Sequence, residues 1–170
     1  MLGYVRAAGQ GEADRLLAAV ARDLMAQGWP LAGAVQVNVE TRPASPCDME
    51  LHVLSLSQVV PISQRLGAMA RGCRLDPEGL EHAAGLVERA LDNGPRLLII
   101  NKFGKQEAEG RGFRPLIGVA LGRAIPVLTC VSDANLAAFE AFAGGMGEPL
   151  PGERDAVIAW CRSVSAACQA

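Results

Sequence analysis

The residues most able to do chemistry lie in a turn near the start of the chain. The run from Arg6 to Ala13 reads Arg-Ala-Ala-Gly-Gln-Gly-Glu-Ala, and it separates a short apolar segment from a segment with helical spacing. A glycine-rich turn between a strand and a helix can cradle phosphate with backbone N–H groups and the positive end of the helix dipole. The sequence therefore predicts an anion-binding turn that includes Arg6, Gly9 and Gly11.

The same turn lacks the side chains that a phosphate-cleaving P-loop needs. In the pattern GxxxxGK[ST], the lysine reaches the outer phosphates and the hydroxyl binds magnesium. Here Arg6 stands in place of the first glycine, Glu12 in place of the lysine and Ala13 in place of the hydroxyl. Unit charges about 4 Å apart near a protein surface interact by about 4 kcal/mol. Replacing lysine by glutamate therefore turns an attraction of this size to a polyphosphate into a repulsion. The turn favours binding over phosphoryl transfer, and an ordinary turn whose Glu12 complements the helix dipole stays open as the alternative.

A second glycine-rich loop, residues 101–112, follows the most apolar strand pattern in the chain. Its candidate ligand contacts are the Asn101 amide and the three cations Lys102, Lys105 and Arg111. Open α/β sheets bind ligands beyond the carboxyl ends of their strands, so this loop is a candidate ligand contact. Glu107 and Glu109 nearly neutralise its cations, so a solvated charged loop remains the alternative.

A third candidate is the run Arg71-Gly72-Cys73-Arg74. The flanking arginines favour the thiolate form of Cys73, and Arg71 and Arg74 are themselves candidate anion contacts. A packed, unreactive cysteine is the alternative. The chain has five cysteines, no CxxC pair and two histidines outside any ligand spacing, so neither a disulfide framework nor a metal site is predicted. Cys130, Cys161 and Cys168 are expected to pack.

The segments that must position these residues alternate between strand and helix patterns. The predicted strands cover residues 2–5, 31–39, 49–54, 96–101 and 125–130. The predicted helices cover residues 12–26, 76–91, 113–123, 132–142 and 153–168. Residues 41–75 are expected to form a hairpin-like excursion, and residues 102–112 a loop. This order predicts a single α/β domain over residues 1–170, with a mostly parallel sheet flanked by helices.

The composition excludes some classes of binding partner. The chain has 170 residues, of which half are hydrophobic, and a formal net charge of −2. This balance predicts no general attraction to nucleic acid or to an anionic membrane. No apolar run reaches the roughly 18 residues of a membrane span, and the first residues do not resemble a signal peptide. We expect a cytoplasmic protein, and the sequence leaves a homo-oligomer open.

Three runs, Leu97–Gly112, Gly122–Thr129 and Gly72–Pro77, resemble a bacterial family, domain of unknown function 2478. The likeness covers nearly the whole chain, and the family is similar to the small P-loop nucleoside triphosphatases. In those enzymes the matching strand ends in Asp-Glu-Ile-Gly-Lys, whose acids serve magnesium and water. Residues 101–105 here read Asn-Lys-Phe-Gly-Lys. The resemblance implies a P-loop-type fold with degenerate Walker A and Walker B positions, and a link to molybdate handling.

The leading hypothesis is a non-hydrolysing binding protein for a molybdate-like or phosphate-like oxyanion, or for a phosphate-bearing ligand. Its ligand is a small anion, such as molybdate, and no catalytic residue is predicted. One alternative is a divergent nucleoside triphosphatase or nucleotidase that uses Glu12 or Glu107 as a base. Another is a scaffold or regulatory protein in which Trp29, Phe139 and Phe142 form a contact patch.

Overall fold

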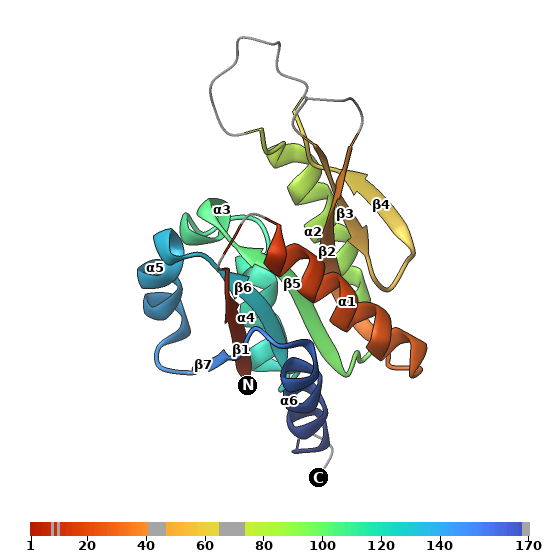
Figure 1. Ribbon diagram of the computed structural model, residues 1–170, viewed down its shortest axis with the longest axis vertical. Helices are drawn as coiled ribbons and strands as arrows, with labels where there is room; N and C mark the ends of the chain where they lie inside the picture. The colour runs from red at the N-terminus through yellow and green to blue at the C-terminus, as the bar shows by residue number, and fades with distance from the viewer. Residues whose placement is uncertain (8, 10, 41–46, 65–73, 168–170) are drawn as a thin grey trace.

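The computed structural model describes residues 1–7, 9, 11–40, 47–64 and 74–167. It contains one seven-stranded sheet, in the order β4-β3-β2-β5-β6-β1-β7, with helices on both faces (Figure 1). The strands are β1 (Leu2–Arg6), β2 (Leu31–Val39), β3 (Asp48–Val53), β4 (Gln58–Pro61), β5 (Leu97–Phe103), β6 (Val127–Val131) and β7 (Gly147–Leu150). The helices are α1 (Glu12–Ala26), α2 (Pro77–Leu91), α3 (Lys105–Ala108), α4 (Arg114–Gly122), α5 (Asp133–Ala143) and α6 (Arg154–Ala167).

Most of the sheet is parallel. The pairs β2–β5, β5–β6, β6–β1 and β1–β7 run in the same direction, whereas β3 and β4 extend the sheet as antiparallel strands. The central strands β5 and β6 are almost wholly buried aliphatic segments, as parallel strands covered on both faces must be. The predicted α/β class with a mostly parallel sheet is confirmed.

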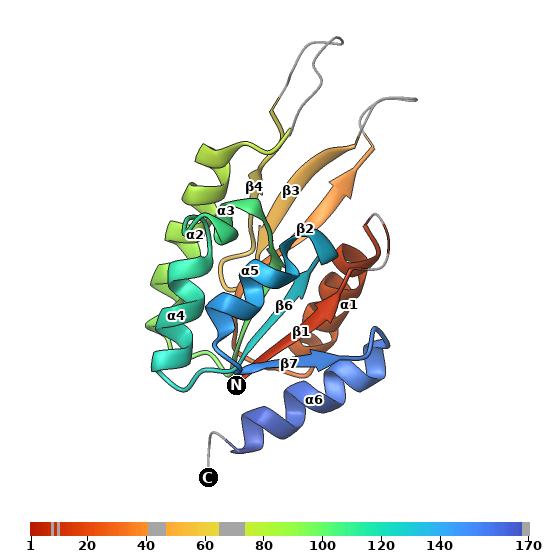
Figure 2. The ribbon, with the colours of Figure 1, turned by 90° about the vertical axis from the view of Figure 1, so that its left-hand side faces the viewer.

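Two apolar layers form the core. One joins the sheet to α2, α4 and α5, and it includes Leu98, Ile100 and Phe139. The other joins the opposite face to α1 and α6, and it includes Leu17 and Ile99. Figure 2 shows the two helix layers on either side of the sheet. No helix in the described ranges is long and apolar enough to cross a membrane.

The sequence patterns locate most elements to within a few residues. Asp76 caps α2 as predicted, because its carboxylate accepts a hydrogen bond from the backbone N–H of Glu78. Two elements were missed. Residues 105–108, which were predicted as loop, form the single-turn helix α3, and residues 147–150 form the edge strand β7. Both are only four residues long, too short for a periodic pattern to be recognised.

The strands β1 and β6 end side by side at the carboxyl edge of the sheet. These strands are parallel neighbours, with Arg6 aligned to Val131 at their ends. The helix that follows β1 packs in one apolar layer, and the helix that follows β6 packs in the other. Open α/β sheets form ligand crevices at such switch points, outside the carboxyl ends of the strands. The turn after β1 therefore lies where this fold binds ligands.

Candidate functional site

The first turn leaves β1 after Arg6 and enters α1 at Glu12. Gly11 precedes the helix with φ 71° and ψ 0°, a left-handed conformation that glycine adopts without the steric cost of a Cβ atom. Within the described part of the chain, no side chain caps α1. Among the described residues, no side chain accepts from the first N–H groups of this helix, although its first turn carries the carboxylates of Glu12 and Asp14. Free N–H groups at a helix start are the feature that an anion site uses.

Arg6 projects from the end of β1 toward the start of α5. Its Nη2 and Nε donate to the same Asp133 carboxylate oxygen, at 2.6 and 3.2 Å. Both side chains are largely exposed, at 58% and 75%. The hydrogen bond and charge of Asp133 raise the pKa of Arg6, so Arg6 remains a cation at the end of β1, already paired with a carboxylate.

Asn101 lies on β5, two residues before the strand ends at Phe103, and is only 3% exposed. Its Nδ2 donates to Asp14 Oδ1 at 2.7 Å, and its Oδ1 accepts from the backbone N–H of Gln36 at 2.8 Å. Asp14 is itself 6% exposed, and its second oxygen accepts from Asn38 Nδ2 at 3.2 Å. These contacts join the first turn of α1 to the ends of β5 and β2.

Sequence reasoning missed Asp14 and Asn38. A signal for Asp14 was present, since it continues the buried stripe of α1, where Leu17, Ala21 and Leu24 recur at three- and four-residue spacing. A carboxylate on such a stripe must find buried partners. Nothing in the local pattern identified those partners, because they come from β2 and β5.

The network explains why an amide stands at the end of β5. The Asn101 side chain must donate to the Asp14 carboxylate and accept from a backbone N–H. An aspartate at this position has no proton to donate when ionised, and two carboxylates in contact cannot both ionise freely. An aspartate at position 101 would therefore be unfavourable beside the buried Asp14 carboxylate.

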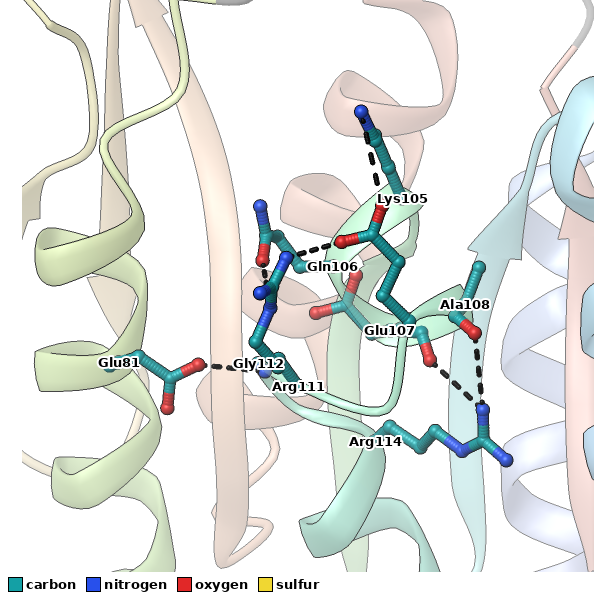
Figure 3. A network of polar contacts seen from close by, with 9 residues as sticks. Glu81, Lys105, Gln106, Glu107, Ala108, Arg111, Gly112 and Arg114 are labelled. Atoms are coloured by element: carbon teal, nitrogen blue, oxygen red, sulfur yellow. Dashed lines mark hydrogen bonds and ion pairs between the residues drawn. The ribbon is translucent and has the colours of Figure 1, made fainter.

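The loop after β5 is held by two carboxylates, one from the loop itself and one from α2; Figure 3 shows the second, Glu81, directed at the backbone of Gly112. Glu107 is 4% exposed, and its two oxygens accept from the backbone N–H groups of Gly104, at 2.9 Å, and Phe113, at 3.1 Å. Burial raises the pKa of the Glu107 carboxyl, and these two hydrogen bonds limit the rise. Glu81 on α2 accepts from the backbone N–H of Gly112 at 2.8 Å. The Glu107 carboxylate thus organises the loop and does not reach toward solvent as a base would.

The cations of this loop are mostly paired within it. Lys105 Nζ lies 3.8 Å from a carboxylate oxygen of Glu109. Arg111 pairs with the same carboxylate and donates to Gln106 Oε1 at 2.9 Å. Lys102 is exposed and makes no ion pair within the described ranges. Of these three cations, Lys102 is the one that no described carboxylate balances, so it can contact an anion.

The third candidate run is only partly described. Arg71 and Cys73 lie outside the described residues. Arg74 donates to the backbone carbonyl of Cys47 at 3.0 Å and to Asp48 Oδ1 at 3.1 Å. It thus anchors the start of β3, two strands away from β5 in the sheet, and no described contact joins it to the first turn.

Two of the cysteines expected to pack are buried. Burial raises the pKa of Cys130 to about 11 and of Cys161 to about 12, so neither thiol ionises at neutral pH. Cys168 lies outside the described residues. No group of three His, Cys, Asp or Glu side chains in the described ranges is arranged to hold a metal ion.

The aromatic residues proposed as a contact patch lie on opposite faces of the sheet. Trp29 is half-buried against the layer of α1 and α6, with the Arg96 guanidinium over its ring, whereas Phe139 and Phe142 belong to the other layer. Phe139 is fully buried, and its ring packs against Tyr4 and Phe103. Phe142 stacks on Phe103 beneath the guanidinium of Arg114.

Residues 2–160 match the family model described as Protein of unknown function (DUF2478). The chain belongs to this family. It is also 38% identical, over 156 residues, to a protein of Bradyrhizobium diazoefficiens named molybdenum import ATP-binding protein ModC 2. The alignment covers 92% of this chain but only 17% of that protein, so the chain spans about a sixth of this relative's length. No solved structure matches the chain significantly.

Proposed function

We propose that this protein binds an oxyanion, or a ligand that carries one, in the turn after β1 and does not hydrolyse it. The observation that carries the proposal is the combination of Gly11 in a left-handed conformation with a start of α1 that no described side chain caps, next to the end of β1. There the backbone N–H groups and the helix dipole favour a negative charge. Arg6 and Lys102 add cations at the same edge.

The candidate ligands are tetrahedral dianions, molybdate-like or phosphate-like, and nucleotides that end in phosphate. The named relative supports this class, because its name joins molybdenum import to ATP binding. Both ligands present tetrahedral oxygens to a binding turn. The geometry of the turn fits tetrahedral oxyanions as a class and does not select molybdate, phosphate or a nucleotide among them.

Several features argue against hydrolysis. Glu12 and Ala13 stand where a P-loop enzyme has its lysine and hydroxyl, and Asn101 is committed to Asp14 and Gln36. Glu107, the alternative base, is buried against two backbone N–H groups. The exposed Glu12 remains as the candidate for a divergent nucleotidase.

Isothermal titration calorimetry with molybdate, tungstate, phosphate and ATP tests the proposal. We expect at least one to bind with a dissociation constant below about 1 mM, and binding to weaken in Lys102→Ala. Asp92→Asn, on the exposed C-cap of α2, serves as a control for general charge effects. The absence of submillimolar binding by all four ligands would refute the proposal, and phosphate release from ATP that Glu12→Gln abolishes would favour the nucleotidase.

A further inference from the structure

We propose that an apolar hollow at the amino edge of the sheet, where the parallel strands begin, docks a partner protein through one aromatic or long aliphatic side chain. The partner is the counterpart of the segments that the longer relative carries outside its matched region. The hollow lies at the edge opposite the first turn, so its role is independent of the proposed anion binding.

The hollow is open and has a volume of about 310 Å³. It belongs to the amino edge because two of its lining residues, Pro30 and Pro95, lie just before β2 and β5. Its other walls come from the last turns of α1 and α2 and from the turn between β3 and β4. All of its lining side chains except Ser55 and Asn93 are apolar.

Trp29 forms a fixed wall of the hollow. Its backbone N–H donates to the Leu24 carbonyl at 3.0 Å, where α1 ends. The guanidinium carbon of Arg96 lies 3.9 Å from the centroid of the Trp29 ring, and Arg96 Nε donates to Ser165 Oγ at 3.0 Å. The indole is therefore held before anything binds, and a partner that packs on it loses little side-chain entropy in this wall.

Apolar side chains also surround the hollow. Met25, which lines it, is 42% exposed, and Leu56, which follows the lining residue Ser55, is 43% exposed. A small ligand needs a pocket that buries most of its surface, whereas this hollow is open and its rim is apolar. Such a hollow suits a single anchor side chain, whose neighbours on the partner cover the exposed apolar rim.

The longer relative indicates the source of this partner. Its matched region is 17% of that protein, so more than four fifths of its length lies outside the match. The match covers 92% of this chain, so the additional segments of the relative continue from near an end of the equivalent domain.

Both ends of this fold lie at the amino edge. Figure 2 shows the start of β1 and the end of α6 there, and Ser165 in the last turn of α6 contacts Arg96 beside Trp29. The additional segments of the relative are thus tethered near the equivalent of the hollow, where their effective concentration is high. A protein that corresponds to these segments is the partner that fits the hollow of this chain.

Site-specific photo-crosslinking of the full chain, in cells of the species that encodes it, tests the surface and the partner together. Benzoylphenylalanine replaces Ser55, which is exposed at the rim of the hollow. The control replaces Asp133, which is 75% exposed at the opposite edge of the sheet. We expect position 55, and not position 133, to capture a protein that mass spectrometry aligns with the relative outside its matched region.

Calorimetry with this captured protein, once purified, then tests the hollow itself. Met25→Asp should weaken binding at least tenfold, because its carboxylate would be desolvated against the apolar anchor. Met146→Asp is the matched control, since Met146 is 58% exposed and directly precedes β7, four strands away from β2. It should retain the wild-type affinity. Circular dichroism melting verifies that both variants are folded.

Two results would overturn the docking site. The first is that position 55 captures no protein, or only proteins that do not align with the additional segments of the relative. The second is that Met25→Asp and Met146→Asp bind the captured protein with the same affinity. Met25→Asp should bind phosphate and molybdate as wild type does, so these results leave the anion proposal to its own titrations.

Discussion

The turn after β1 and the loop after β5 both lie at the carboxyl edge of the sheet and both are rich in glycine. They differ in what their backbone N–H groups contact. In the second loop, the N–H groups of Gly104, Gly112 and Phe113 all donate to carboxylates of the protein itself. At the start of α1, no described side chain takes that role.

This difference teaches that a glycine-rich loop with cations is not necessarily an anion site. The glycines of the second loop serve internal acceptors, since a Cβ atom at Gly112 would clash with the Glu107 carboxylate. Its cations Lys105 and Arg111 are balanced by Glu109. We therefore expect an anion to bind mainly at the first turn. Lys102, near the end of β5, would add a positive charge beside it.

The largest expected loss of stability comes from the buried contact between Asn101 and Asp14, which links the two regions. Asn101→Asp places a second carboxylate against Asp14 and removes the amide donor. We expect a loss of about 2–4 kcal/mol in the free energy of unfolding at neutral pH, as for other uncompensated buried charges. Urea denaturation measures it.

The double variant Asp14→Asn with Asn101→Asp is its control. It exchanges donor and acceptor across the same contact and should recover part of the lost stability. If Asn101→Asp alone is as stable as wild type at neutral pH, the network does not fix the amide at the end of β5.

Removal of the internal acceptor in the second loop gives the next largest effect. Glu107→Ala leaves the N–H groups of Gly104 and Phe113 without their partner. We expect about 1–3 kcal/mol of lost stability, measured by thermal melting, with Glu109→Ala as the exposed comparison. A melting temperature equal to that of wild type would show that this carboxylate does not organise the loop.

The fold was largely predictable because its signals are local. Helix stripes, the Asp76-Pro77 start of α2 and the aliphatic run of β5 each lie within one segment. The site was predictable only in part. The first turn and Asn101 were located from motif position, but the partners of Asp14 and Arg6 come from distant segments, and no spacing in the sequence encodes those contacts. The partners of Glu107 lie in its own loop, but α3 is too short for a periodic pattern to reveal them.

The first turn should respond to a change in its backbone. Gly11→Ala places a Cβ atom on a residue with φ 71°, which costs about 1 kcal/mol in stability. We also expect anion affinity to fall, because the turn must reshape to relieve the strain. Gly110→Ala in the second loop, where φ is 90°, is the matched control. It should reduce stability but leave anion affinity unchanged. If both variants lose affinity equally, the first turn is not the preferred anion site.

The buried carboxyl predicts a pH dependence. Because burial raises the pKa of Glu107 above its ordinary value of 4.5, the folded protein binds this proton more tightly than the unfolded chain does. The contribution of Glu107 to stability is therefore fully present below pH 4.5 and is lost as pH rises through the folded-state pKa. Urea denaturation of wild type and Glu107→Gln between pH 4.5 and 7.5 measures the difference, and a relative gain by wild type with rising pH would contradict the sign.

The smallest effect is expected from the surface cations of the second loop. Arg111→Ala removes an exposed pair with Glu109 and should cost less than about 0.5 kcal/mol. Its anion affinity should equal that of wild type. A clear loss of affinity, measured by calorimetry, would show that this loop takes part in anion binding.

Amide chemical shifts during titration with phosphate and molybdate distinguish the two regions, because glycine N–H signals report each of them separately. If the first turn binds the anion, the largest shifts occur at Gly9, Gly11 and the first residues of α1, while Gly104 and Gly112 shift little. Larger shifts at Gly104, Gly112 and Phe113 than in the first turn would contradict it.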